Sequence, residues 1–214
     1  MVIQLYGHPF SLFAWKALIA AYERGVAFEF RMVDADHPDN LARIQLLSPT
    51  GQFPALIDGD QEVTGSNAVI AWLDRHGDTP PMVPPGDAGL RARELVEAFD
   101  AYVAVPLQRI VAEYFRGEDE KDPRGVADAR ATLDKSYAWL ARRMGDGWAL
   151  GAAFTIADCA AAPSLFYADW VHPIPSGALK AYRARLLKHP PVARVVDEAR
   201  PYRHFFPPGA PDRD

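Results

Sequence analysis

Two hydroxyl groups and an imidazole stand close together near the N-terminus. Tyr6, His8 and Ser11 fall within one stretch of six residues. Tyr6 ends a short β-prone run, and Ser11 begins a helical pattern. A hydroxyl can donate a hydrogen bond to an anion, and a helix N-terminus adds the positive end of its dipole. This segment is therefore a candidate anion site, with Ser11 and Tyr6 as competing donors and His8 as a further one.

The spacing of other reactive residues argues against several kinds of site. The six histidines show no i, i+4 pair and no other spacing typical of metal ligands, so we expect no metal site. The single cysteine, Cys159, excludes an intramolecular disulfide and a multi-cysteine zinc site, and it indicates a reducing cytoplasm. Its small apolar neighbours predict a core thiol. No glycine-rich phosphate loop follows a predicted strand.

The composition is that of an ordinary globular protein, with 214 residues, 49% of them hydrophobic and 24% charged. The net charge of −5 argues against a nucleic-acid or anionic-membrane partner. No apolar run approaches the roughly 20 residues of a membrane span, and no export signal is visible. Residues 1–77 hold five Lys/Arg and nine Asp/Glu, so the acidity is concentrated in the first third.

The first third must position the hydroxyls, and its pattern alternates between strands and helices. Strands are expected at 2–6, 27–33, 53–57 and 61–64, and helices at 11–24, 39–47 and 66–76. The order β-α-β-α-β-β-α requires a parallel first pair and a final antiparallel hairpin. Gly25 is expected to end the first helix, and Ser66 is expected to be the N-cap of the last.

Strand signals vanish after residue 77. Four prolines within residues 78–86 predict a stiff connector. The predicted organisation is an α/β domain at 1–77, a linker at 78–86, an all-helical domain at 87–200 and a tail at 201–214. Helices are expected at 87–116, 123–144, 155–170, 177–187 and 191–199. Pro106 should kink the first of them.

Three local motifs stand where these elements begin. The first surrounds a proline that opens a strand, Ser48-Pro49-Thr50-Gly51-Gln52-Phe53-Pro54-Ala55-Leu56-Ile57-Asp58-Gly59. The second stands at a helix start, Gly65-Ser66-Asn67-Ala68-Val69-Ile70. The third is Phe154-Thr155-Ile156-Ala157-Asp158. In the third motif, Thr155 and Asp158 have the spacing of a capping box. A capping box stabilises the start of a helix, so this motif gives no evidence about the functional site.

With these motifs the chain resembles the soluble glutathione transferases over residues 2–200, and it is closest in character to the theta, phi and bacterial classes. The resemblance implies a thioredoxin-like N-terminal domain, an all-α C-terminal domain and a homodimer. It implies glutathione as co-substrate, with its thiolate attacking a small hydrophobic electrophile. Two alternatives stay open: a glutathione-dependent isomerase, lyase or peroxidase, and a non-catalytic binding or interaction protein on the same scaffold.

The resemblance also assigns roles in the first motif. It implies a cis peptide bond before Pro54, with Phe53 offering its N–H and C=O to the ligand peptide, as in strand addition. Gln52 is the best match for contacting the glycine-end carboxylate. His37 and Asn40 are weaker candidates for that contact.

In the second motif, the resemblance places the γ-glutamyl carboxylate at Ser66 and Asn67, on the free N–H groups of a helix start. Gly65 stands where the family has Glu or Gln, whose side chain accepts from the ligand amino group. Glycine lacks that acceptor. Asp100, on the first helix of the second domain, is a candidate substitute.

The resemblance favours Ser11 as the thiol activator, because theta, phi and zeta members use a serine in this loop. Tyr6 stands where other classes place a catalytic tyrosine. The loop contains no cysteine, which argues against disulfide-exchange chemistry. An electrophile pocket is expected between the domains. Its candidate walls are Phe10, Leu12, Tyr102, Tyr114, Trp170, His204 and Phe205.

Overall fold

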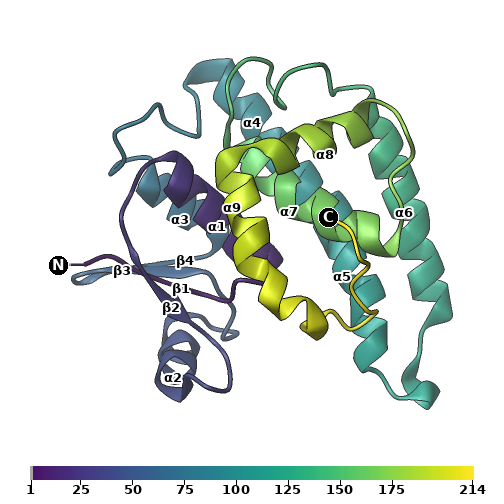
Figure 1. Ribbon diagram of the computed structural model, residues 1–214, viewed down its shortest axis with the longest axis horizontal. Coiled ribbons are helices and arrows are strands. Elements are labelled where there is room, and N and C mark those ends of the chain that lie inside the picture. The colour runs from purple at the N-terminus through teal and green to yellow at the C-terminus, as the bar shows by residue number, and fades with distance from the viewer. Residues whose placement is uncertain (1) are drawn as a thin grey trace. The chain divides into compact units, whose positions relative to one another are not determined.

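The computed structural model describes residues 2–214 in two compact units, one ending at Val83 and the other beginning at Pro84 (Figure 1). The strands of the first unit are β1 (Gln4–Gly7), β2 (Glu29–Met32), β3 (Ala55–Asp58) and β4 (Gln61–Thr64). Its helices are α1 (Leu12–Glu23), α2 (Pro38–Leu47) and α3 (Ser66–Leu73). The predicted order of elements is confirmed.

The four strands form one mixed sheet in the order β2-β1-β3-β4. β1 pairs with β2 in parallel and with β3 antiparallel, and β3 and β4 form the expected hairpin. Its two-residue loop contains Gly59 at φ 59°, a conformation that glycine adopts without steric cost. In Figure 1, α1 and α3 lie on one face of this sheet and α2 lies on the other. The sheet thereby brings the end of β1 and the starts of β3 and α3 to one edge.

The first helix ends as its sequence predicts. Gly25 has φ 66°, its N–H donates to the carbonyl of Tyr22 at 3.2 Å, and the N–H of Val26 donates to that of Ala21 at 3.1 Å. These two bonds make a Schellman motif, in which a left-handed glycine satisfies the last carbonyls of a helix.

The start of α3 differs from the prediction. Gly65, and not Ser66, is the N-cap residue, and Ser66 is the first residue of the helix. The carbonyl of Gly65 accepts the first helical bond from Val69 at 3.0 Å. Gly65 has φ 87° and ψ 138°, a backbone conformation that glycine adopts far more readily than other residues. The turn into the helix is therefore made by the glycine, which moves the serine one position inward.

The second unit is helical. Its helices are α4 (Gly86–Phe99), α5 (Val105–Ala112), α6 (Pro123–Ala141), α7 (Ile156–Val171), α8 (Ala178–Lys188) and α9 (Pro190–Ala199). Short 3₁₀ turns occur at Glu113–Phe115, Glu118–Glu120 and Arg200–Phe205. The last of these lies largely in the predicted tail, where no helical turn is expected from the sequence.

The prediction of one kinked helix over 87–116 is wrong in its detail. A π-helical turn at Asp100–Ala104 separates α4 from α5, so the break precedes Pro106. Proline lacks the N–H that would bond to the carbonyl four residues earlier, and its ring clashes with that carbonyl. The distortion therefore falls in the turn before the proline.

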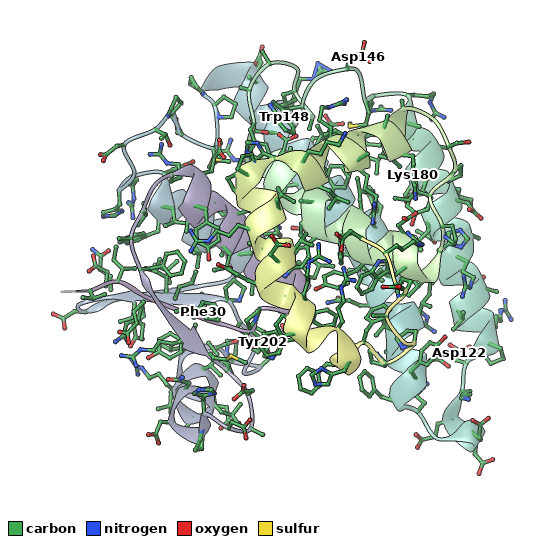
Figure 2. The ribbon with its side chains drawn as sticks, viewed as in Figure 1. Phe30, Asp122, Asp146, Trp148, Lys180 and Tyr202 are labelled. Carbon is green, nitrogen blue, oxygen red and sulfur yellow. The ribbon has the colours of Figure 1, made fainter. Side chains whose placement is uncertain are left out.

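Helix α7 forms the centre of the second unit. Every residue from Ile156 to Asp169 is buried, and Figure 1 shows the other helices around this one. The buried carboxylate of Asp169 accepts from Lys180 at 2.6 Å and from Arg213 at 2.7 Å (Lys180 is labelled in Figure 2). Arg213 thereby fixes the C-terminal segment to this helix.

Among residues 2–214, no helix has both the length and the apolar character that crossing a membrane requires.

Candidate functional site

Ser11 lies between the end of β1 and the start of α1, as expected. It is the N-cap residue of α1: its Oγ accepts from the N–H of Ala14 at 3.3 Å, and its own N–H donates to the carbonyl of His8 at 3.0 Å. The hydroxyl hydrogen of Ser11 has no acceptor among residues 2–214, so it is available to a bound anion at the positive end of the helix.

The His8 ring is half-buried beside this serine. Its Nδ1 accepts from the N–H of Phe10 at 3.1 Å, so the neutral ring carries its proton on Nε2. Burial lowers the pKa of His8 below 6.5, against a smaller opposing effect of the Asp34 carboxylate. His8 is therefore neutral at neutral pH, and it can act as a hydrogen-bond donor through Nε2.

The Tyr6 hydroxyl is already engaged. Its ring is 6% exposed and packs with Val33, Ile44 and Ala55 in the core between the sheet and α2. The hydroxyl lies 3.1 Å from Oε1 of Gln4 and donates to it, two residues back along β1. The Tyr6 hydroxyl hydrogen is thus used in a hydrogen bond to Gln4, whereas the Ser11 hydroxyl hydrogen has no acceptor among residues 2–214.

The loop before β3 leaves a backbone donor and acceptor available. The Phe53–Pro54 peptide bond is cis, as expected. The carbonyl of Pro54 accepts from the N–H of Gly65 at 3.0 Å, which holds this loop against the start of α3. Neither the N–H nor the C=O of Phe53 makes a hydrogen bond within the described chain, and the side chain of Gln52 beside it is exposed. An extended peptide could pair with Phe53 as an added strand.

The start of α3 presents a second set of donors. The N–H groups of its first turn, beginning at Ser66, precede the first helical bond. The Ser66 side chain is only 7% exposed, and its hydroxyl has no partner in residues 2–214. The side chain of Asn67 is exposed. No atom beyond its chain neighbours lies within 4 Å of where a Cβ on Gly65 would stand, so there is open space beside Gly65 at the start of α3.

The two weaker candidates for the glycine-end carboxylate are tied to other groups. Nδ1 of His37 lies 2.6 Å from Oδ1 of Asp34, and Nδ2 of Asn40 donates to the carbonyl of Met32 at 2.8 Å. The hydrogen bond from His37 is the main cause of a lowered pKa of Asp34, which therefore stays ionised. This acid-imidazole pair, three residues apart on the loop before α2, is a feature that motif matching alone did not single out.

Tyr102 and Tyr114 do not line the same cavity. Tyr102 lines a hollow of about 260 Å³ against α6, and Tyr114 lines a separate hollow of about 550 Å³ that includes Glu113 and Arg116. The two hollows share no lining residue. Asp100 also lies in this second unit, at the start of the π-helical turn.

The other proposed wall residues have varied surroundings. Trp170 packs edge-on against Phe206, with ring centroids 5.0 Å apart. Nδ1 of His204 lies 2.9 Å from the carbonyl of Pro201, and Phe205 is 57% exposed. Phe10 and Leu12 belong to the first unit, beside Ser11.

The third motif has the structural role expected of it. Oδ2 of Asp158 accepts from the N–H of Thr155 at 2.8 Å, which gives the capping box at the start of α7. Oδ1 of the same residue accepts from Ala149 N–H and from the Tyr182 hydroxyl. Cys159 is fully buried, as predicted. In the described part of the chain, no group of three or more His, Cys, Asp or Glu side chains could hold a metal ion.

Known proteins match this chain over most of its length. The glutathione S-transferase N-terminal domain model matches residues 5–81, and the C-terminal domain model matches residues 123–198. Glutathione S-transferase 1 of Dianthus caryophyllus is 26% identical over 95% of this chain and 89% of its own. Stringent starvation protein A homolog of Coxiella burnetii is 26% identical over 87% of this chain and 86% of its own.

A solved structure shares the same fold. The glutathione S-transferase of Methylobacterium radiotolerans, in complex with glutathione sulfonate, superposes with a TM-score of 0.75 at 25% identity, over 92% of this chain and 95% of its own. The two domain models match in the expected order, and together they span more than half of the chain. The chain therefore belongs to the glutathione S-transferase family.

Proposed function

We propose that the protein is a glutathione transferase in which the Ser11 hydroxyl stabilises the glutathione thiolate for attack on a small hydrophobic electrophile. The observation that carries this proposal is the hydroxyl hydrogen of Ser11, which no residue from 2 to 214 accepts, at the N-terminus of α1. The oxygen caps the helix while the hydrogen is left for the sulfur.

The amount of stabilisation required is modest. A free thiol has a pKa of about 8.5, so only a few per cent is thiolate at neutral pH. Lowering that pKa by about two units requires roughly 2.7 kcal/mol of preferential stabilisation of the thiolate. One hydroxyl donor together with a helix dipole is of this order.

The remaining donors support a bound tripeptide. The N–H and C=O of Phe53, beside Pro54, would pair with its central peptide. The start of α3, through Ser66 and Asn67, would hold the γ-glutamyl carboxylate. Gln52 is exposed beside Phe53 and is our candidate for the glycine-end carboxylate.

Two more side chains complete the proposed site on the first unit. His8 would donate through Nε2 to the bound ligand. Phe10 would contact the apolar electrophile. We further propose a cytoplasmic homodimer, on the family resemblance, and sedimentation velocity would test the oligomeric state.

A second function is favoured by different observations. Gly65 offers no acceptor for the ligand amino group, and residues 1–77 carry an excess of four acidic side chains, which repel an anionic tripeptide. One relative bears a name that is not a transferase name, stringent starvation protein A homolog. These features favour a non-catalytic binding protein. A glutathione-dependent isomerase, lyase or peroxidase would use the same thiolate as a transferase.

Calorimetric titration with glutathione, followed by an assay with a generic aryl halide, separates these functions. We expect binding and turnover. Binding without turnover of any electrophile would support the binding protein, and the absence of binding would exclude glutathione as the ligand.

Three variants at Ser11 separate capping from thiol activation. Ser11→Ala removes both, Ser11→Asp keeps only the cap acceptor, and Ser11→Thr keeps both. We expect Ser11→Ala and Ser11→Asp to lower kcat/KM by about 10²–10³-fold. Both variants should also raise the pKa of the bound glutathione thiol, which is measured by the absorbance of the thiolate as a function of pH. Thr should retain most activity. Loss of turnover in Tyr6→Phe but not in Ser11→Ala would assign the role to Tyr6.

A further inference from the structure

A buried tryptophan holds the loop that carries Ser11. Trp15 lies in the first turn of α1 and is 0% exposed. Its indole Nε1–H donates to the carbonyl of Pro9 at 2.6 Å, six residues back along the chain. Its backbone N–H donates to the carbonyl of Ser11 at 3.0 Å. Trp15 therefore fixes two points of the loop between β1 and α1, and one of them is Ser11 itself.

The Pro9 carbonyl depends on this side chain, because the donors of the loop itself are used elsewhere. The N–H of Ser11 donates to the carbonyl of His8 at 3.0 Å, and the N–H of Phe10 donates to Nδ1 of the same histidine at 3.1 Å. Pro9 has no N–H of its own. The conformation of the loop at Pro9 is therefore set by the indole of Trp15.

The orientation of the Ser11 hydroxyl needs such support. Its Oγ accepts from the N–H of Ala14 at 3.3 Å, which is longer than the usual range of about 2.7–3.2 Å for an N–H···O bond. The helix cap alone is thus a loose restraint on this oxygen. A group that acts on a reacting atom must be held within about 0.5 Å of its working position, which requires hydrogen bonds from surrounding residues. The two bonds of Trp15 restrain the backbone that carries this hydroxyl.

A second buried tryptophan in the same unit shows a bond with a structural role only. Trp72, near the end of α3, is 2% exposed, and its Nε1–H donates to Oε1 of Gln61 on β4 at 3.0 Å. Buried indoles usually find such a partner. The partner of Trp15 differs, because it is a backbone carbonyl two residues before Ser11. Burial explains why Trp15 makes a hydrogen bond, but the position of its partner ties that bond to the candidate site.

We propose that Trp15 is a positioning residue for the thiol chemistry, and that its indole N–H holds the Ser11 hydroxyl in the direction of the bound sulfur. Trp15 acts through Ser11 and not on the ligand itself. This role rests on the proposed function, since it takes Ser11 as the donor to the thiolate. It extends the proposed site to a core residue that none of the three motifs contains.

Trp15→Phe removes the indole donor and keeps an aromatic ring in the core. We expect it to raise the pKa of the bound glutathione thiol by about one unit, measured by the absorbance of the thiolate as a function of pH. At a pH below that pKa, kcat/KM with an aryl halide should fall about tenfold, because the thiolate fraction is smaller. S-methylglutathione, which has no thiol to ionise, should bind within about threefold of its affinity for the unmodified chain.

Two further variants identify how the effect reaches the thiol. Trp72→Phe is the matched control, because it removes the same kind of bond from a buried indole, and it should lose stability in urea without changing the thiol pKa. The double variant Ser11→Ala, Trp15→Phe should have the thiol pKa of Ser11→Ala alone, because the hydroxyl that Trp15 positions is absent. If circular dichroism shows that Trp15→Phe is unfolded, benzothienylalanine at position 15 tests the same bond, because it keeps the shape of tryptophan with sulfur in place of the indole N–H.

Three outcomes would overturn this role of Trp15. They are an unchanged thiol pKa in Trp15→Phe, an equal rise in Trp72→Phe, and a rise in the double variant that equals the sum of the two single rises. If Ser11→Ala leaves the thiol pKa unchanged, the proposed function is wrong at Ser11. An effect of Ser11→Ala without one of Trp15→Phe contradicts only the role of Trp15.

Discussion

In the proposed function, the Ser11 hydroxyl has both a structural and a chemical role. The lone pair caps α1 through Ala14, and the hydrogen points to no acceptor among the residues described. Tyr6, with a more acidic hydroxyl, has its hydrogen taken by Gln4. At this scale, the choice between the two donors depends on which hydrogen is unoccupied and not on residue type. The sequence shows both hydroxyls but not this difference.

Gly65 gives a prediction that separates strain from recognition. Gly65→Ala should lower the free energy of unfolding by about 1–3 kcal/mol, because φ 87° and ψ 138° disfavour a side chain. Gly65→Gln should lower the free energy of unfolding by a similar amount. The backbone strain is the same, and the open space beside Gly65 means that the longer side chain adds no clash. Gly65→Gln should also bind glutathione roughly tenfold more tightly, through an added acceptor for the ligand amino group worth about 1.5 kcal/mol.

Urea unfolding and calorimetry measure the two effects, with Gly65→Ala as the control for strain. Equal glutathione affinity of the Gln and Ala variants would show that the amino group is not recognised at this position.

His8 gives a prediction for pH. Its pKa is lowered in the folded protein by burial, so below pH 6.5 the unfolded chain takes up a proton more readily. Stability should therefore fall as the pH drops from 7.5 to 5.5. His8→Asn keeps an acceptor for the N–H of Phe10 but does not titrate, and it should lose this part of the pH dependence. Urea unfolding at both pH values tests this, and an unchanged dependence in His8→Asn would assign the effect to other groups.

The start of α7 depends on one buried side chain. Asp158 accepts four hydrogen bonds, from the N–H and hydroxyl of Thr155, the N–H of Ala149 and the hydroxyl of Tyr182. Asp158→Ala leaves these donors buried without a partner. We expect a loss of about 3–5 kcal/mol in the free energy of unfolding. Tyr182→Phe, which removes one bond, should lose about 1.5–3 kcal/mol, and equal losses in the two variants would contradict this account.

At the scale of elements, the sequence predicts what depends on local pattern. The order of strands and helices along the first unit, the hairpin, the end of α1 at Gly25 and the capping box at Thr155 follow from short-range signals, and all are observed. The π-helical turn before Pro106 could not be derived, because the carbonyl of Tyr102 accepts a hydrogen bond from Ser136 on another helix. The hollow beside it was missed for the same reason.

The candidate site was partly visible in the sequence. The loop at Ser11, the cis proline and the α3 start come from motifs. The partners that occupy Tyr6, His37 and Asn40 are visible only in the structure. Asn40, for example, is held by a carbonyl of β2, and nothing in the local pattern marks that contact.

At the scale of the whole molecule, long-range ion pairs tie distant parts of the second unit together. Asp169 and Arg213 lie 44 positions apart, and Arg213 donates to both the carboxylate and the carbonyl of Asp169. Arg200 and Arg203 both pair with Asp214. Burial would raise the pKa of Asp169, but hydrogen bonds from Lys180, Ile174 and Arg213 lower it overall. The Asp169 carboxylate therefore stays ionised to lower pH than an ordinary aspartate, and this tie weakens only in acid.

Arg213→Ala tests this connection. We expect a loss of about 1.5–3 kcal/mol in the free energy of unfolding, because a buried carboxylate loses a charged donor. We also expect faster proteolysis after residue 206. Lys121→Ala, which removes an exposed pair with Glu118, is the control and should lose about 0.2–1 kcal/mol. Equal effects would mean that Arg213 contributes no more than a surface charge.

The π-helical turn at Asp100–Ala104 has a consequence for comparing this chain with its relatives. A π-helical turn holds one residue more than an α-helical turn, and one residue corresponds to a rotation of about 100° around a helix. A relative with an uninterrupted helix here would align correctly only with a single-residue gap inside this turn. Without that gap, the positions of the relative that are aligned with Asp100 and Tyr102 would lie on a different face of its helix. Any function inferred from those positions would then be assigned to the wrong residues.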